Sequence, residues 1–252
     1  MKEYKFTKQG QNCGYMRISD STDTDENASL YFYGDICGES WQSKYYAEDK
    51  APQDVADFLH ELDGKRKIDI YVNSGGGDVF GGIAIYNILS RYQGETIAHI
   101  DGIAASIAGI IPFACDKVIA KSSAQIMLHK PWSFCMGNAD DMKKCIESLN
   151  TCEQSIIDIY AAHAVNGTTP EKIKSMIDRE TWLTCGQAAQ YFNIEIEQGE
   201  AAAACNSDYF SKYKNIPKDF LKKSDDNENI RKAKLQLELD CLKLQAEKKR
   251  GK

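Results

Sequence analysis

Apolar and polar positions alternate along the chain in a way that predicts strands separated by helices. Apolar runs with strand composition occur at residues 30–34, 68–73, 96–100, 117–120 and 125–128. Apolar residues recur at helical spacing over 51–62 and 79–89. Strands that alternate with helices usually pair in parallel and carry the helices on the sheet faces, so the pattern predicts an α/β fold. Such folds place their chemistry at the carboxyl ends of the strands.

A longer apolar stripe follows, from about Asn138 to Ala164, and predicts one long helix. Asn166-Gly167 ends this pattern, and Thr169-Pro170 provides the cap and first residue of a further helix. The segment 184–187 has the sequence of a capping box and predicts one more short helix. The apolar run 103–115 is shorter than the roughly 20 residues that a membrane span needs, so we expect a buried helix there.

The composition changes beyond Cys205, where lysine, aspartate and asparagine become frequent. We therefore expect one domain over residues 1–205, followed by a charged linker and helical tail over 206–252. The helix expected at 230–249 has two apolar stripes and would be marginal alone in water. It either packs on a partner or a second copy of the chain, or it is a solvated tail.

Composition excludes several classes of function. The net charge of −6 argues against a general binder of nucleic acid or anionic membranes, because both require a basic surface. The N-terminal residues have no apolar core of a secretory signal, so we expect a cytoplasmic protein without membrane association. The nine cysteines are scattered and form no C-x-x-C pair, which predicts reduced thiols, no metal site and no cofactor.

The first candidate for chemistry is the glycine cluster 75–77, directly after the strand expected at 68–73. Its spacing fits neither the dinucleotide fingerprint nor a Walker A loop, so nucleotide binding is a poor interpretation. A backbone without Cβ atoms lets a substrate approach closely and leaves N–H groups free to bind an oxyanion. The simpler alternative is a tight turn.

Ser106 is the candidate nucleophile. It follows the strand at 96–100 and begins an apolar helix, between Ala104 and Ala108. Small neighbours allow a serine to sit on a sharp strand-to-helix turn, and the helix N-terminus favours a nearby oxyanion. A packed helix serine is the plain alternative. Among the four histidines, His129 ends a strand immediately before Lys130, where this fold class places catalysis, and it is the candidate general base.

Three segments together resemble the Clp protease proteolytic subunits. Residues 71–79, YVNSGGGDV, look like the family's Y-I-N-S-P-G-G-S-V; residues 102–107, GIAASI, resemble G-M-A-A-S-M; and residues 127–131, MLHKP, are similar to M-I-H-Q-P. The resemblance covers roughly Leu30 to Glu197. It implies a ClpP/crotonase-like fold of repeated β-β-α units, with the long helix as a protruding handle that joins two rings.

The resemblance implies a serine endopeptidase with Ser106 as nucleophile, His129 as general base, and the N–H groups of Gly77 and Ile107 as oxyanion hole. The third triad member departs from the family, because Glu180 stands where the family has aspartate. Glutamate can orient an imidazole, although its longer side chain needs a different backbone distance. Asp178 is the alternative third member.

A further departure is Gly75, which replaces the family's proline and implies a more flexible oxyanion segment. The divergent N-terminus and the appended charged helix resemble prophage-encoded relatives, which act as head-maturation proteases.

We therefore expect a protein or peptide substrate such as a phage capsid or scaffold protein, in a homo-oligomeric ring or stacked rings. An AAA+ unfoldase is a candidate partner, because this chain has no nucleotide motif of its own to drive unfolding. Two other functions stay open: a ring-forming assembly protein with a vestigial site, and a crotonase-like CoA-ester enzyme. A serine–lysine signal peptidase is disfavoured, since His129 fits a triad.

Overall fold

The structure is a computed structural model that describes residues 2–8, 11–18, 27–38, 50–62, 67–198 and 207–217. Residues 1–216 form one compact unit, and a second unit begins at Pro217. The helix expected at 230–249 lies outside the described residues. The domain boundary expected at residue 205 stays a prediction, and the described residues 207–216 belong to the first unit.

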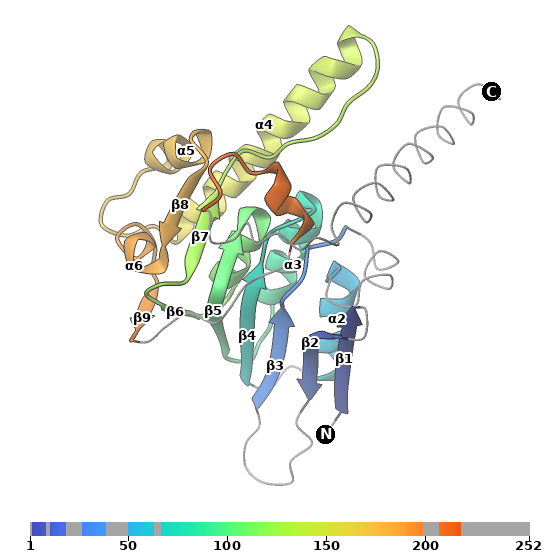
Figure 1. The fold of residues 1–252 in the computed structure, drawn as a ribbon, viewed down its shortest axis with the longest axis vertical. Helices are drawn as coiled ribbons and strands as arrows, with labels where there is room; N and C mark the ends of the chain where they lie inside the picture. Colours follow the sequence, from blue (N-terminus) through green and yellow to red (C-terminus); the bar gives the residue numbers. More distant parts are fainter. Residues whose placement is uncertain are drawn as a thin grey trace, which may run out of the picture. The chain divides into compact units, whose positions relative to one another are not determined.

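Nine strands within the described residues form a single sheet in the order β1-β2-β3-β4-β5-β6-β9, with β7 and β8 joined to β5 (Figure 1). Strands β4, β5, β6 and β9 are parallel to their neighbours, and β3 is parallel to β4 but antiparallel to β2. Strands β1 and β2 pair in antiparallel fashion, and β7 is parallel to β5 but antiparallel to β8. The strands are β1 (Lys2–Lys8), β2 (Gln11–Ile18), β3 (Asn27–Phe32), β4 (Lys67–Ser74), β5 (Thr96–Ala105), β6 (Lys117–Lys121), β7 (Gln125–Leu128), β8 (Thr181–Thr184) and β9 (Glu195–Glu197).

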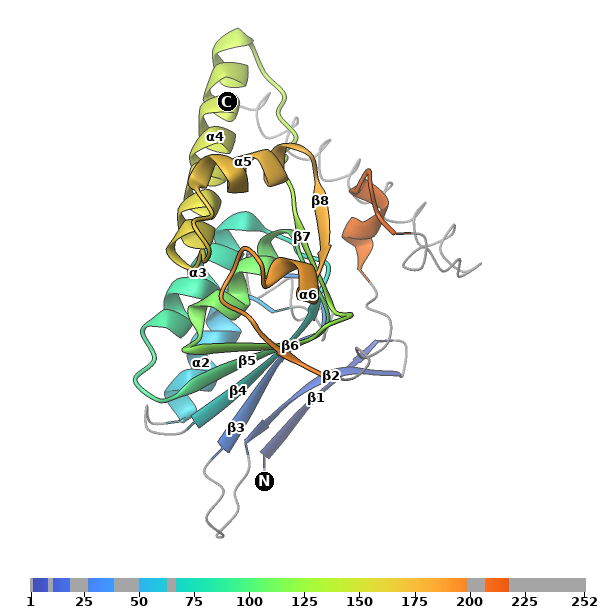
Figure 2. The same ribbon diagram turned by 90° about the vertical axis from the view of Figure 1, so that its left-hand side faces the viewer.

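The helices confirm most of the sequence expectations. Figure 2 shows α2 and α3 against one face of the sheet, where their apolar residues join η1 and the strands in one buried core. The helices are α2 (Pro52–Glu61), α3 (Val79–Ser90), η1 (Ser106–Ala114), α4 (Ala139–Ala162), α5 (Pro170–Asp178), α6 (Cys185–Ala188) and η2 (Asp208–Lys212). The expected α/β class with a largely parallel sheet is therefore confirmed.

Strand β5 changes partner halfway along its length, and this change positions the candidate site. Residues 97–100 pair with β6, while residues 103–105 pair with β7. The expectation that a helix begins near Ile103 is wrong, because β5 continues to Ala105 and the helix starts at Ser106. The second pairing holds the last residues of β5 extended, so Ser106 lies at the strand end.

Helix α4 is anchored by its second half only. Its buried residues all lie from Cys152 onward, whereas most of the side chains between Ala139 and Thr151 are exposed. In Figures 1 and 2 this first half extends beyond the sheet, with the chain that follows β7 running beside it. The sequence therefore predicted the long helix correctly. Its role as a handle between rings stays a prediction.

Candidate active site

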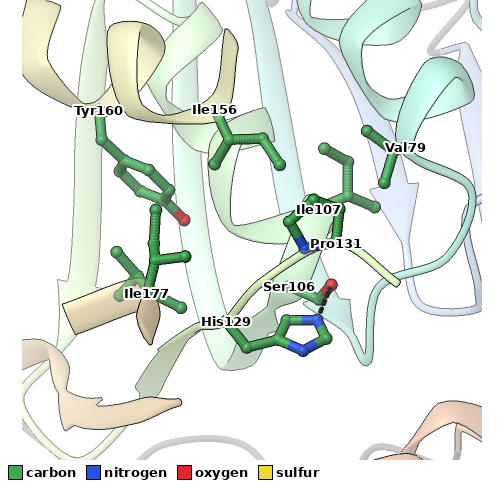
Figure 3. A pocket seen from close by; sticks show the side chains of 9 residues that line it. Val79, Ser106, Ile107, His129, Pro131, Ile156, Tyr160 and Ile177 are labelled. Atoms are coloured by element: carbon green, nitrogen blue, oxygen red, sulfur yellow. Dashed lines mark hydrogen bonds between the residues drawn. The ribbon is translucent and has the colours of Figure 1, made fainter. Parts of the chain in front are cut away.

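Ser106 and His129 meet at the carboxyl ends of two paired strands. Because β5 and β7 are parallel, with Ala105 opposite Met127, the residues that follow them emerge at the same edge of the sheet. The Ser106 Oγ lies 2.6 Å from the Nε2 of His129 (Figure 3). This distance and this nitrogen are those that a general base needs in order to take the hydroxyl proton. The two residues selected from sequence are therefore brought together.

The backbone of Ser106 is held in an unusual conformation. Its φ of +55° lies in the left-handed region, which costs a non-glycine residue about 1–3 kcal/mol and concentrates at functional sites. The preceding Ala104 and Ala105 are fully buried and small, which allows the sharp change from strand to helix. Ile107 is in the first turn of η1, where backbone N–H groups have no partner within the helix. Its N–H is therefore available beside the hydroxyl.

The glycine segment 75–77 is held in place by hydrogen bonds to the backbone of Ile36. The Ile36 N–H donates to the Gly76 carbonyl and the Asp78 N–H donates to the Ile36 carbonyl, both at 2.8 Å. These two bonds leave the Gly77 N–H unused. A Cβ on Gly76 would lie 2.8 Å from the Cβ of Ser106, and one on Gly77 would lie 2.1 Å from the Ile36 oxygen. The close approach to Ser106 and Ile36 therefore requires glycine at both positions.

Two opposing effects act on the pKa of His129. Burial lowers this pKa below its usual range, and the negative charge of Glu180 opposes the decrease. The net effect is a lowered pKa, so the imidazole is neutral at neutral pH. A neutral Nε2 beside a serine hydroxyl is the form that accepts a proton.

The two candidates for the third triad member are both bound to other groups. Glu180 has a φ of +49°, and its Oε1 accepts the backbone N–H of Asn215 at 2.6 Å. Within the described residues, no hydrogen bond joins Glu180 to His129. Asp178 is paired with Lys130 at 2.8 Å and Lys174 at 3.1 Å, which lower its pKa. The assignment of a third member stays a prediction, with Glu180 close enough to act through its charge.

A narrow apolar crevice opens beside the serine and histidine (Figure 3). Besides these two residues and Tyr160, its lining is entirely apolar and comes from five elements and the loop after β7: Val79, Ile107, Leu128, Pro131, Ile156 and Ile177. The Tyr160 hydroxyl is buried and has no hydrogen-bond partner among the described residues. The crevice is suited to an apolar side chain.

A larger cavity of about 400 Å³ shares Ser106 and His129 with this crevice. Gly77 and Trp132 are among the residues that line it, and Tyr209 and Lys212 also contribute to it. Sequence analysis missed these last two residues, because the region after residue 205 has the composition of a linker. Their contribution depends on contacts with residues more than 70 positions earlier, which no local pattern indicates.

Two of the other three histidines lie within hydrogen-bond distance of a polar side chain. His99 lies 3.0 Å from Asp69, and His163 lies 3.2 Å from the Tyr86 hydroxyl. Across the described ranges, no group of three or more histidine, cysteine or acidic residues could hold a metal ion. None of the helices described combines the length and the apolar character that crossing a membrane requires.

Comparison with protein families places this geometry in context. The family model described as "Clp protease" matches residues 46–195, which is more than half of the chain. An ATP-dependent Clp protease proteolytic subunit from Bacteroides fragilis is 29% identical over 140 residues, covering 55% of this chain and 67% of the relative. Proteolytic subunit 2 from Rhodococcus jostii is 31% identical over 148 residues, covering 58% and 75%. The chain spans roughly two thirds of the length of such relatives, with coverages from 62% to 75%.

A solved structure supports the fold. A mutant of ClpP1 from Listeria monocytogenes matches with a TM-score of 0.56 and 22% sequence identity, over 68% of this chain and 92% of that chain. The part of this chain that the family model matches ends at residue 195, before the segment that contains Tyr209 and Lys212. The walls of the larger cavity therefore include residues from outside the family match.

Proposed function

Because the chain belongs to the Clp protease family, we propose that it is a serine peptidase with Ser106 as nucleophile and His129 as general base. The observation that carries this proposal is the 2.6 Å hydrogen bond from the Ser106 hydroxyl to the Nε2 of His129. It occurs at a strained strand end, beside unused backbone N–H groups and an apolar crevice. These are the parts that acyl transfer to a serine requires.

The proposed reaction has two stages. The Ser106 Oγ attacks the scissile carbonyl carbon while its proton moves to His129, and the carbonyl oxygen becomes an oxyanion near the N–H groups of Gly77 and Ile107. Collapse of this intermediate breaks the C–N bond, and the His129 proton passes to the leaving amine. A water molecule then gives its proton to His129 and attacks the acyl group, and the protonated His129 returns a proton to Ser106 as the acid leaves.

The proposal is tested with a fluorophosphonate, which reacts with activated serines. Intact-mass spectrometry of the treated protein should show a single adduct, mapped to Ser106 and missing from Ser106→Ala. His129→Ala should slow the labelling strongly while the protein stays folded. Such an adduct would also separate a peptidase from a crotonase-like CoA-ester enzyme, which needs no nucleophilic serine. Folded wild-type protein without any adduct would contradict the proposal and favour a vestigial site.

We further infer that the peptidase is a homo-oligomeric ring, which can stack into double rings and work with an AAA+ unfoldase. The apolar side chains that α4 and the preceding segment leave exposed support self-association, because large exposed apolar groups favour burial against a partner: Trp132, Phe134, Met136 and Ile146. Light scattering of the purified protein tests this directly. A monomer at micromolar concentration would argue against the ring.

For the substrate, we propose phage capsid or scaffold proteins. The support is the sequence on either side of the family match, residues 1–45 and 196–252, which the family model does not cover. Co-expression with a phage capsid precursor should yield a trimmed product that Ser106→Ala abolishes. Unaltered capsid protein, in a preparation that the fluorophosphonate labels, would contradict this substrate while leaving the peptidase assignment intact.

A further inference from the structure

The segment 207–216, which follows the family match, is hydrogen-bonded at three separate points to residues in or near the candidate active site. The Ser207 hydroxyl donates to Asp35 at 2.6 Å, the Tyr213 hydroxyl donates to the Gly75 carbonyl, and the Asn215 N–H donates to Glu180 at 2.6 Å. Figure 2 shows η2, the helix of this segment, on the side of β7 and β8 that faces away from α3. The segment therefore contacts both the glycine segment 75–77 and Glu180.

Tyr213 is the residue of this segment that contacts the proposed catalytic machinery most directly. It is 7% exposed, and its ring centroid lies 5.0 Å from that of His129, with the two planes at 74°. Trp182 packs on the same tyrosine at 5.9 Å. An imidazole that is held only by its bond to Ser106 could rotate about its side-chain torsions. The tyrosine ring packs edge-on against the imidazole and limits that rotation.

The hydroxyl of Tyr213 acts on the glycine segment. It donates to the carbonyl of Gly75, two residues before the Gly77 N–H that we propose as an oxyanion donor. The Gly76 N–H, which belongs to the same peptide unit as the Gly75 carbonyl, donates to the Ser74 hydroxyl at 3.2 Å, and the Gly76 carbonyl that follows accepts the Ile36 N–H. A segment that glycine would leave flexible is thus fixed from both sides. Preorganised donors contribute most to catalysis when they need not reorganise.

Gly75 and the segment depend on each other. A Cβ on residue 75 would lie 2.3 Å from the Cβ of Ser207 and 2.2 Å from its Oγ, so any larger residue would displace the segment. The φ of Gly75 does not lie in the left-handed region that favours glycine, so the backbone itself would accept alanine. The reason for glycine here is the room that Ser207 occupies.

From these contacts we propose that Tyr213 is a positioning residue of this active site, which holds the His129 imidazole with its ring and the oxyanion segment with its hydroxyl. The proposal rests on the proposed serine peptidase activity. It also explains how the site works without a carboxylate bonded to His129. Asn215 completes the arrangement, because its side-chain amide donates to the carbonyls of Arg179 and Glu180 at 3.1 and 3.2 Å and so fixes the charge near the imidazole.

The test uses full-length variants and the second-order rate of fluorophosphonate labelling of Ser106. Tyr213→Phe removes the bond to Gly75 while keeping the ring, and should lower the rate about tenfold, a typical cost of one buried hydrogen bond. Tyr213→Ala also removes the ring and should lower it about 100-fold, as small misplacements of reacting groups do. Gly75→Ala should resemble Tyr213→Ala. Lys214→Ala, an exposed change on the same segment, should label like wild type.

A second measurement does not depend on activity. In protein with ¹³C-labelled histidine, the His129 ring signals, assigned by comparison with His129→Asn, report the pKa and motion of the imidazole. Burial lowers this pKa and the nearby charge is Glu180, so Tyr213→Ala should raise it toward 6.5 and increase ring motion, whereas Tyr213→Phe should leave both unchanged. Thermal unfolding verifies that each variant is folded.

Three results would overturn the positioning role. Labelling of folded Tyr213→Ala at the wild-type rate would make the tyrosine a bystander, and faster labelling would make the segment an inhibitory cover. Unchanged His129 signals in Tyr213→Ala would overturn it even in an inactive protein. Failure of the proposed peptidase is distinguishable, because folded wild-type protein would then give no adduct at all.

Discussion

Substituting Glu180 by glutamine tests how the third position of the triad works in this protein. The change preserves size and the capacity to accept the Asn215 N–H, and removes only the negative charge. In the structure this carboxylate acts on His129 through its charge and not through a hydrogen bond. The expected effect is therefore electrostatic. Glutamine should weaken the stabilisation of the imidazolium that forms when His129 takes the serine proton.

The magnitude follows from Coulomb's law. Two unit charges about 4 Å apart, at an effective dielectric constant of about 20, interact by about 4 kcal/mol, and a carboxylate that makes no bond to the imidazole lies farther away, so about half of that energy, about 2 kcal/mol, is expected. This energy corresponds to a decrease in kcat of about 30-fold. Where a triad carboxylate bonds directly to the histidine, its amide variant loses about 10⁴-fold, because the wrong tautomer is then favoured. The two arrangements therefore predict decreases that differ by more than two orders of magnitude.

The assay is the rate of fluorophosphonate labelling of Ser106, followed by peptide hydrolysis once a substrate is known. Asp178→Asn is the matched control, because that carboxylate is held by Lys130 and Lys174 and should affect the rate less than twofold. Glu180→Gln should also lower the pKa of His129 further, since it removes the effect that opposes burial. A loss near 10⁴-fold would refute this reasoning and show that Glu180 bonds to His129 in the working enzyme. An unchanged rate would refute any role for the charge.

Three further outcomes are expected. The labelling rate should fall as the pH decreases through the lowered pKa of His129, because only the neutral imidazole accepts the serine proton. The midpoint should lie below 6.5, and a midpoint above 6.5 would contradict the effect of burial. Gly76→Ala, at a φ of +111° and 2.8 Å from Ser106, should abolish labelling and cost about 1–3 kcal/mol in urea unfolding. Tyr160→Phe should be neutral or stabilising by up to about 1 kcal/mol in the same experiment, because it removes a buried hydroxyl without a partner; clear destabilisation would point to a bound water.

Local sequence patterns were sufficient for the parallel sheet, most of the helices and the pair Ser106 and His129. These features depend on short-range preferences: apolar periodicity, capping residues and the position of a polar side chain at a strand end. The patterns failed for the end of β5, because its last residues are extended by pairing with β7 and their small side chains do not favour either state. They also missed the short strands β8 and β9, whose four and three residues carry too little periodicity.

The sequence and the structure give different reasons for the glycine at residue 75. The sequence suggested that replacing a proline by glycine loosens the oxyanion segment, an inference from the conformational freedom of glycine alone. In the structure Gly75 does not use that conformational freedom. Ser207, 132 positions later, occupies the space that a side chain at residue 75 would need, and the Tyr213 hydroxyl donates to the Gly75 carbonyl. The glycine at residue 75 and the later segment therefore fit each other. Either alone would leave a collision or a gap beside the serine, so departures from a family motif are best judged together with the segments that lie outside the family match.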